Sequence, residues 1–450
     1  MRFPKFRYPW WPYPPQFPGE GFRSINTNVG DGFPAPRFPI SVYRAMHHRT
    51  MGDCRPKIIY LKQPGGVYFS SGIYYNNSKA PPFWQEMQVR MKILIITNHS
   101  YMLYRFRCEL IAALQKEHEV VLSMPFVGHE DDFMAMGLRC INTEVDRRGI
   151  NPKTDWKLMQ AYRKLLKEER PDLVITYSIK PNIYAGLACS MAKIPFCANV
   201  QGLGTAFQRK GLAQLVTLLY RTALKKAKVA FFENEGNAQE FIDRKILLRE
   251  KITVLPGAGI NLERYPLATY PENDRMHFLY LGRVMREKGI DELFAAMRRL
   301  HGELGDKVVL DLVGFFDDDY EAEVKSLVDD GIAVFLGFQT EPTPYYAAAD
   351  CVVLPSYHEG LSNVLLEAAA IGRPVITSNI HGCKEVVDDG ASGLLCRVKD
   401  AEDLYQKMLQ MAHLPRSDRE KMGLAARRKV EREFKKTMVV QDTIDAIFAK

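Results

Sequence analysis

The most constraining feature of the chain is a regular alternation of two sequence patterns from Met91 onward. Continuously apolar runs are MKILIIT, HEVVLSM and DLVITYS, and between them lie stretches with apolar residues at helical spacing, among them FRCELIAALQKE and DWKLMQAYRKLLKEER. Strands buried on both faces of a parallel sheet are continuously apolar, and each parallel connection needs a crossover, usually a helix. The alternation therefore predicts an α/β fold with a doubly wound parallel sheet.

The same pattern starts again after a break rich in turn residues, PGAGINLERYPLATYPEND, near residues 256–271. Further apolar runs are HFLYLG, VVLDLVG, CVVLPS and PVITSN, with helical stretches such as GIDELFAAMRRLHGEL between them. We therefore predict two doubly wound, Rossmann-like domains, at 91–262 and 272–435, with a ligand between them at the carboxyl ends of both sheets. The last segment, about 436–450, is expected to cross back to the first domain.

Residues 1–90 have a different composition. They contain 13 of the 26 prolines of the chain, interleaved with aromatic residues as in PKFRYPWWPYPPQFP. Proline lacks a backbone N–H and has a fixed φ, so prolines at every second or third position prevent both helical and strand ladders. We expect this segment to be a disordered extension, or sequence upstream of a natural start at Met91.

The overall composition is that of an ordinary soluble globular protein, with 46% hydrophobic and 25% charged residues. No run of 18 or more apolar residues is present, which excludes a membrane-spanning helix. The eight cysteines are scattered without a CxxC pair, so we expect reduced thiols in a cytoplasm rather than disulfides or metal ligands.

Charge is distributed unevenly along the chain. Residues 91–265 contain 26 Lys and Arg against 18 Asp and Glu, whereas residues 266–450 contain 23 against 31. A basic first half suggests an anionic partner, although two solvated surfaces of opposite charge explain the numbers as well. The basic amphipathic stretch 209–228 leaves a similar choice, because it can lie on an anionic membrane surface or pack its apolar face on the sheet.

The sharpest motif is PSYHEGLSNVLLEAAAIGRPVITSN. Glu359 lies in the loop after a predicted strand, and Glu367 lies about one turn inside the helix that begins near Ser362. The backbone N–H groups of residues 361–364 would favour an anion such as a diphosphate. So placed, Glu367 could accept both ribose hydroxyls and Glu359 could hold a sugar hydroxyl. Taken alone, two glutamates at this spacing are more often a helix first turn and a solvated charge.

A second motif, GRVMREKG at residues 282–289, directly follows the predicted strand HFLYL. Arg283 and Lys288 bracket its turn, so a planar guanidinium and a point-charge ammonium can converge on one phosphate group. Read in isolation, these residues also describe a basic, solvated loop. The two motifs together, in this order and after strands of one domain, indicate a phosphate-binding crevice.

The pair GR-x4-KG and E-G-x2-N-x3-E, followed by GRPVITSN, GCKEVVDDG and SGLL, resembles family 4 retaining glycosyltransferases over about residues 92–450. The resemblance implies two Rossmann-like domains facing across a cleft, the GT-B architecture. It further implies that Arg283 and Lys288 bind the donor diphosphate, with Glu359 on the donor sugar. Glu367 would then bind the ribose. The other donor contacts that we predict are Gly282, Gly360, Leu361, Ser362 and Asn363.

Three further stretches, YSIKPNIYAGLA, NVQGLGTAF and YRTALKKAKVAFFENE, resemble members that build capsule, O-antigen or protein-glycan repeats on undecaprenyl diphosphate. This implies transfer of a hexose or N-acetylhexosamine from a nucleotide sugar, expected to be a UDP-sugar, to a lipid-diphosphate-linked glycan. The basic first domain would bind that acceptor at an anionic membrane surface, with the enzyme cytoplasmic and peripheral on the inner face of a bacterial plasma membrane. Candidate acceptor-binding residues are Asn98, His99, Arg105, Lys180, Gly202 and Gly204.

Two stretches depart from that family. TNHSYMLYRFR, after the first strand, lacks the glycines that let the backbone approach a donor phosphate in many members, and TYSIKP replaces a histidine that many members place near Tyr177. Gly202 and Gly204, in QGLGT, either admit a substrate near the backbone or form a strand-to-helix turn.

We expect catalysis to rest on electrostatics, since no Ser or Cys beside a general base can be placed. Arg283, Lys288 and the helix start near Ser362 would stabilise the departing diphosphate, with retention of configuration and without a metal or another cofactor. Asp317, Asp318 and Asp319 resemble a metal-binding DxD motif in the wrong architecture, so we expect them to cap a helix.

Three other functions stay open at this stage. A sugar-nucleotide epimerase on the same fold would need an acid-base pair that the sequence does not place. A non-catalytic scaffold should lack one of the charged donor residues, all of which are present. Nucleic-acid binding, which we do not expect, would depend on translation of the basic segment 1–90.

Overall fold

A computed structural model of the chain describes residues 90–146, 151–203, 207 and 210–449, together with the short strands β1 (Lys62–Gln63) and β2 (Gly66–Val67). β1 and β2 pair with each other in the antiparallel sense. Apart from these strands and Arg90, the predicted disordered extension lies outside the described residues, and Gly204 does so too. The elements from β3 onward belong to one compact unit, Gln85–Lys450.

The first half of this unit contains a parallel sheet with the strand order β5-β4-β3-β6-β7-β8-β9. The order proceeds outward in both directions from β3 and β6, as in a doubly wound sheet, so the predicted fold class is confirmed. The strands are β3 (Lys92–Ile96), β4 (Glu119–Met124), β5 (Arg139–Asn142), β6 (Leu173–Tyr177), β7 (Phe196–Val200), β8 (Val229–Phe232) and β9 (Ile252–Val254).

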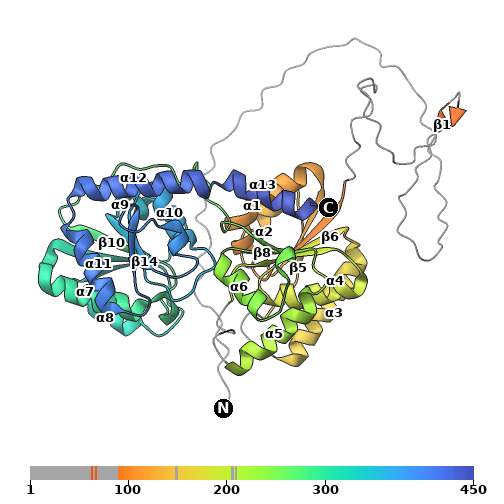
Figure 1. Cartoon of the computed structure of the whole chain (residues 1–450), viewed down its shortest axis with the longest axis horizontal. Coiled ribbons are helices and arrows are strands. Elements are labelled where there is room, and N and C mark those ends of the chain that lie inside the picture. The colour runs from red at the N-terminus through yellow and green to blue at the C-terminus, as the bar shows by residue number, and fades with distance from the viewer. Residues whose placement is uncertain are drawn as a thin grey trace, which may run out of the picture. The chain divides into compact units, whose positions relative to one another are not determined.

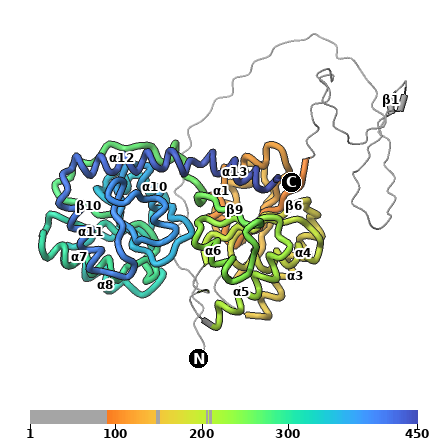
Figure 2. The backbone as a smooth tube through the Cα atoms, viewed as in Figure 1, coloured from red at the N-terminus to blue at the C-terminus, as the bar shows by residue number. Residues whose placement is uncertain are grey.

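Helices cover both faces of this sheet. Because side chains alternate along a strand, Ile93 and Ile95 of β3 pack toward one set of helices and Leu94 and Ile96 toward the other. The first set is α1 (Ser100–Glu117), α2 (Glu130–Ala135) and α13 (Lys436–Phe448). The second set, grouped on one side in Figure 2, is α3 (Pro152–Glu169), α4 (Gly186–Ala192), α5 (Lys210–Leu224) and α6 (Glu235–Asp243). A short π-helical segment, Pro181–Ala185, leads into α4.

The second half contains a parallel sheet with the order β12-β11-β10-β13-β14-β15. The winding direction reverses between β10 and β13, so the loops after these two strands lie next to each other at the carboxyl edge. Those loops carry the two motifs. The strands are β10 (Met276–Leu281), β11 (Val308–Val313), β12 (Ala333–Gly337), β13 (Cys351–Leu354), β14 (Val375–Ser378) and β15 (Gly393–Cys396).

One core joins the helices of this half to its sheet. On α7, Leu293, Phe294 and Met297 are fully buried, and on α11 Met408 is. The helices are α7 (Ile290–Leu304), α8 (Glu321–Asp329), α9 (Thr343–Ala348), α10 (Asn363–Ile371), α11 (Ala401–His413) and α12 (Arg416–Glu433).

The C-terminal helices connect the two halves (Figure 1). α12 packs on α10, whereas α13 packs on α1 and places Val439 and Ile447 in the core of the first sheet. Two backbone hydrogen bonds hold the crossing: Ile260 N donates to Phe434 O at 2.7 Å, and Lys436 N donates to Ile260 O at 2.9 Å. Among the described residues, no helix is both long and apolar enough to cross a membrane.

Candidate functional site

The two motif loops contact each other at the carboxyl ends of β10 and β13. Tyr357 N donates to Glu287 O at 2.9 Å, and Gly289 packs on Pro355. A Cβ at Gly289 would lie 2.1 Å from Pro355 O, and its φ of +73° is strained for any other residue. The second glycine of GRVMREKG therefore permits the contact that brings the basic turn beside residues 355–362. Gly282, the first glycine, follows β10 directly and donates its N–H to Val313 O at 2.9 Å.

Both cations of the basic turn already have carboxylate partners. Lys288 Nζ lies 2.5 Å from Glu359 Oε1, and both side chains are largely buried. Arg283 donates to Asp317 Oδ2 at 2.6 Å, while its side chain is 48% exposed. The structure thus brings Lys288 to Glu359, whereas Arg283 bonds to Asp317 after β11, and an anion that binds either cation has to exchange with its carboxylate.

The predicted capping role of the three aspartates is wrong. The N-cap residue of α8 is Tyr320, whereas Asp317 bonds to Arg283 and Asp318 Oδ2 accepts the backbone N–H of Arg286 at 2.9 Å. The carboxylates of Asp317 and Asp318 therefore hold the basic turn instead of the helix that follows them. Among the described residues, no group of three or more His, Cys, Asp or Glu side chains is arranged to hold a metal ion.

The helix predicted to begin near Ser362 does so, since Ser362 is the N-cap residue of α10 and its Oγ accepts from Leu365 N at 3.4 Å. Asn363 is the first residue of the helix. Two of the N–H groups expected to face an anion have protein acceptors. Ser362 N donates to Gly382 O at 2.8 Å, and Leu361 N donates to Glu233 Oε2 at 3.2 Å.

Glu367 is a buried carboxylate, 6% exposed, one turn inside α10. The hydroxyl of Tyr265 donates to Oε1 at 2.7 Å, and the hydroxyl of Tyr346 donates to Oε2 at 2.9 Å. Burial raises the pKa of Glu367, and the Arg105 guanidinium, 3.7 Å away, opposes that rise. Each carboxylate oxygen thus has one donor and retains further acceptor capacity.

Residues 359–361 are also held by the first domain. Asn234 Nδ2 donates to Glu359 O at 3.4 Å and to Gly360 O. A Cβ at Gly360 would lie 1.7 Å from Gln201 O, so only glycine allows the loop after β7 to approach this closely. Gly202, predicted to bind the acceptor, lies beside the same loop, since a Cβ on it would be 3.8 Å from Gly360 N.

A buried ion pair of the first domain lies next to this contact. Arg107 NH2 donates to Glu233 Oε1 at 2.8 Å, and its guanidinium lies 5.4 Å from the ring centre of Tyr177. Burial raises the pKa of Glu233, an effect that Arg107 opposes and Glu359 reinforces. Glu233 and Asn234 belong to FFENE, part of a stretch that carried the family resemblance, but the sequence analysis assigned no role to either residue. Polar residues directly after a buried strand of a parallel sheet are the signal that could have identified them.

The remaining acceptor candidates fall into two groups. Asn98 and His99 follow β3, and His99 is the N-cap residue of α1. Arg105, further along α1, donates to Tyr265 OH at 2.6 Å and to Thr340 O at 3.5 Å. The structure therefore places Arg105 beside Glu367, among the donor candidates.

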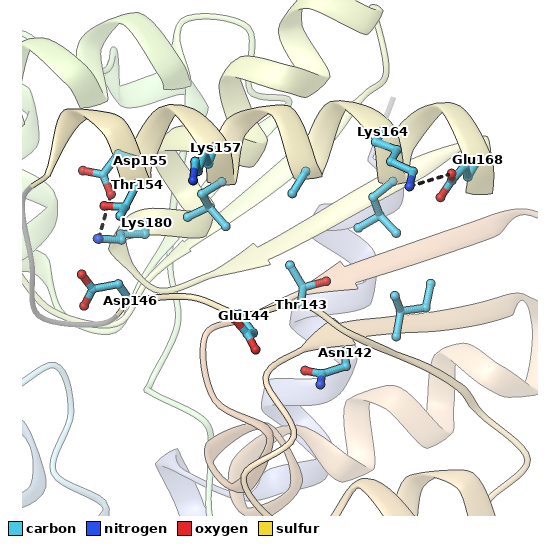
Figure 3. A pocket seen from close by; sticks show the side chains of 14 residues that line it. Asn142, Thr143, Glu144, Asp146, Thr154, Asp155, Lys157, Lys164, Glu168 and Lys180 are labelled. Carbon is cyan, nitrogen blue, oxygen red and sulfur yellow. Dashed lines mark hydrogen bonds and ion pairs between the residues drawn. The ribbon is translucent and has the colours of Figure 1, made fainter. Parts of the chain in front are cut away.

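Lys180 lies elsewhere in the first domain, in a cavity of about 490 Å³. Its Nζ is 2.8 Å from Asp155 Oδ1, and Figure 3 shows this pair at one end of the cavity and the Lys164–Glu168 pair at the other. The lining comes from the end of β5 and the segment after it, from α3 and from Lys180.

Two family models match the chain. The model for group 1 glycosyl transferases matches residues 275–413, and the model for glycosyl transferase 4-like domains matches residues 92–234. Each match covers one of the two parallel sheets for most of its length.

Curated relatives extend over both halves. An N,N'-diacetylbacillosaminyl-diphospho-undecaprenol alpha-1,3-N-acetylgalactosaminyltransferase of Campylobacter jejuni is 30% identical over 337 residues, 71% of this chain and 88% of the relative. A UDP-Gal:alpha-D-GlcNAc-diphosphoundecaprenol alpha-1,3-galactosyltransferase of Escherichia coli is 26% identical over 321 residues, 63% of this chain and 77% of the relative.

Among solved structures, HepE of Anabaena in complex with UDP-glucose superposes with a TM-score of 0.67. The match covers 80% of this chain and all of HepE at 18% sequence identity, so the likeness bears on the fold alone.

Proposed function

The chain belongs to the family 4 glycosyltransferases, with the group 1 and 4-like domains, and on that premise we propose that it transfers a sugar to a glycan carried on undecaprenyl diphosphate. The sugar is a hexose or N-acetylhexosamine, and the donor is a UDP-sugar. The two relatives named above act on undecaprenyl-diphosphate-linked sugars by name, which supports this acceptor class. The reaction belongs to bacterial surface polysaccharide or glycan assembly.

The observation that carries the proposal is the convergence of the basic turn and the start of α10 at neighbouring strands. Arg283 and Lys288 bind the diphosphate of the donor by leaving Asp317 and Glu359. This exchange replaces one anionic partner by another, so neither cation is left without a counter-charge at any stage. Glu359, released from Lys288, then contacts the sugar.

The nucleoside end of the donor lies at Glu367. The hydroxyls of Tyr265 and Tyr346 orient its carboxylate, and its remaining lone pairs accept the ribose hydroxyls. Arg105 supports this arrangement through its bond to Tyr265, which favours a place for it in the donor site rather than the acceptor site.

Departure of the diphosphate is the step that the site promotes. Arg283 and Lys288 neutralise the leaving group, and the backbone N–H groups at the start of α10 add a favourable field. Negative charge on Glu359 stabilises the sugar as its bond to the diphosphate stretches. This scheme uses neither a metal nor another cofactor, and it retains the anomeric configuration.

We assign nucleotide-sugar binding to residues 272–435, and acceptor binding to residues 91–262 together with 436–450. We assign Asn98, His99 and Gly202 to the acceptor side, and Gly202 lies beside Gly360 of the loop 359–361. We assign Lys180, in the cavity beside α3, to an acceptor phosphate or its glycan. Gly204 stays an acceptor candidate outside the described residues.

The first half also exposes large apolar side chains, which support the membrane part of the proposal. On α5, Val216, Tyr220 and Ala223 are buried against the sheet, whereas Leu215 and Leu218 are 44% and 58% exposed. On the neighbouring helices α3 and α4, Trp156 and Met191 are 60% and 57% exposed. Exposed apolar side chains on a basic half support peripheral binding at the cytoplasmic face of an anionic bilayer, where the lipid-linked acceptor resides.

The test is a transfer assay with the full chain, a panel of UDP- and GDP-sugars, and undecaprenyl-diphosphate-linked mono- and oligosaccharides. We expect acceptor-dependent release of UDP with one hexose or N-acetylhexosamine donor, and an acceptor product heavier by one sugar. The absence of acceptor-dependent nucleotide release across the panel would refute the proposal. Sugar interconversion without acceptor would point to an epimerase instead.

A further inference from the structure

The transfer proposed above gives no task to Glu233, a carboxylate whose side chain is only 13% exposed. Glu233, directly after β8 of the first domain, is bonded on both oxygens: Oε1 accepts from Arg107 NH2 at 2.8 Å, and Oε2 accepts from Leu361 N at 3.2 Å. The second bond crosses from one parallel sheet unit to the loop that precedes α10 of the other.

The carboxylate of Glu233 occupies the immediate approach to that loop. A Cβ on Gly360 would lie 2.4 Å from Glu233 Oε2, so any side chain at position 360 would collide with the Glu233 carboxylate. The start of a helix attracts negative charge through its unpaired N–H groups and its dipole. In this structure the attraction acts on Glu233, an anion supplied by the protein itself.

Two ion pairs meet around the loop. Arg107–Glu233 comes from the first domain, and Lys288–Glu359 comes from the second. The two carboxylates repel each other, and each is tolerated in a largely buried position because its own cation is adjacent. A diphosphate adds further negative charge to the same place, and at least one carboxylate must then give way.

We propose that Glu233 is a positioning residue that competes with the nucleotide diphosphate for the loop 359–361 and is displaced from this loop when the donor binds. This inference rests on the proposed function. On displacement Glu233 keeps its bond to Arg107 and loses only the bond to Leu361 N. When UDP is the product, the return of Glu233 to that N–H promotes its release.

Glu233→Gln tests the competition, because glutamine keeps the shape and an acceptor oxygen but not the charge. We expect the variant to bind UDP about two- to tenfold more tightly than the wild type in isothermal titration, the range of one modest hydrogen bond. Glu235→Gln is the matched control: it removes the same charge two residues away, on a side chain that is 59% exposed and paired with Arg249. The control should bind UDP as the wild type does.

Kinetics supply a readout that a purely structural role would not produce. If the return of Glu233 promotes product release, the Glu233→Gln variant lowers the donor KM and lowers kcat as well, because UDP leaves more slowly. A structural defect would instead raise KM or lower the amount of folded enzyme, which thermal melting measures independently.

A double variant, Arg107→Met with Glu233→Gln, guards against two complications. It leaves no buried guanidinium without a partner, so it should fold even where the single variant does not. It also excludes a second explanation for tighter UDP binding, in which Arg107, without the Glu233 charge, attracts the diphosphate. We expect the double variant to bind UDP more tightly than the wild type; tighter binding in the single variant alone would overturn the competition.

The outcomes also separate this inference from the function on which it rests. If neither UDP nor GDP binds the wild type, the nucleotide-donor proposal fails, and the competition fails with it. If UDP binds the wild type, and both variants bind UDP with the same affinity as the wild type or more weakly, the proposed function stands and the role of Glu233 is refuted.

Discussion

Replacement of Glu359 by glutamine separates donor binding from sugar transfer. Glu359→Gln keeps the shape of the side chain but removes the negative charge that lies 2.5 Å from Lys288 Nζ. In the proposed donor complex this charge lies beside the sugar carbon, where positive charge develops as the bond to the diphosphate stretches. The charge therefore stabilises the transition state more than the ground state, and its loss should appear in kcat.

The geometry also predicts the sign of the effect on nucleotide binding. In the wild type, Lys288 exchanges Glu359 for a phosphate oxygen, whereas in the variant Lys288 has no carboxylate to leave. We therefore expect UDP to bind Glu359→Gln at least as tightly as the wild type. Turnover should fall by about 100-fold or more, since one preorganised electrostatic contact to a transition state is worth about 3 kcal/mol.

Isothermal titration with UDP and a nucleotide-release assay on the same preparations measure the two effects. Glu272→Gln is a suitable control, because its side chain is 87% exposed and its only change is one surface charge. A Glu359→Gln enzyme that turned over near the wild-type rate would refute the placement of the reacting sugar at this loop. Loss of UDP binding in the same variant would refute the exchange of partners at Lys288.

Three further predictions concern the cation, the domain crossing and the membrane surface. Lys288→Met should weaken UDP binding by about tenfold to a hundredfold in the same titration, since it removes a charge-assisted bond and leaves Glu359 to repel the diphosphate. Burial lowers the pKa of Lys436 from 10.5 to about 8, so folding disfavours its charged form and wild-type stability should rise as pH increases between these values. Lys436→Met should then melt at a higher temperature than the wild type at pH 7, a stabilisation of about 3 kcal/mol, with a smaller difference at pH 10. Leu215→Gln with Leu218→Gln should reduce sedimentation with anionic vesicles without changing the melting temperature, and equal wild-type binding to neutral vesicles would contradict the charge argument.

The sequence predicted best those features that depend on neighbouring residues. The run HFLYL is part of β10, and α10 begins at the position that its N-cap serine indicates. The strict alternation of apolar runs and helical stretches was enough to predict two doubly wound sheets. A buried parallel strand and its crossover helix each have a local signature, and few sheet topologies accommodate many such units in succession.

Predictions about the partners of polar side chains were less successful. A capping role was the natural local interpretation of Asp317, yet its carboxylate bonds to Arg283, 34 residues earlier in the chain. The sequence did not indicate that the guanidinium of Arg105, predicted to bind the acceptor, contacts Tyr265, which in turn bonds to Glu367. Nothing in the local pattern around either residue identifies these partners.

The sequence alone thus determined the two-sheet architecture, the placement of both motifs after strands of the second sheet, and the helix start that favours an anion. Only the tertiary structure decided which carboxylate faces which cation, and that Glu233 reaches Leu361 across 128 residues of chain. The reason is physical. Periodicity encodes which face of an element is buried, but a hydrogen bond between loops depends on strand order and on the close approach of two backbones. Strand order and backbone approach emerge only when the whole chain is packed.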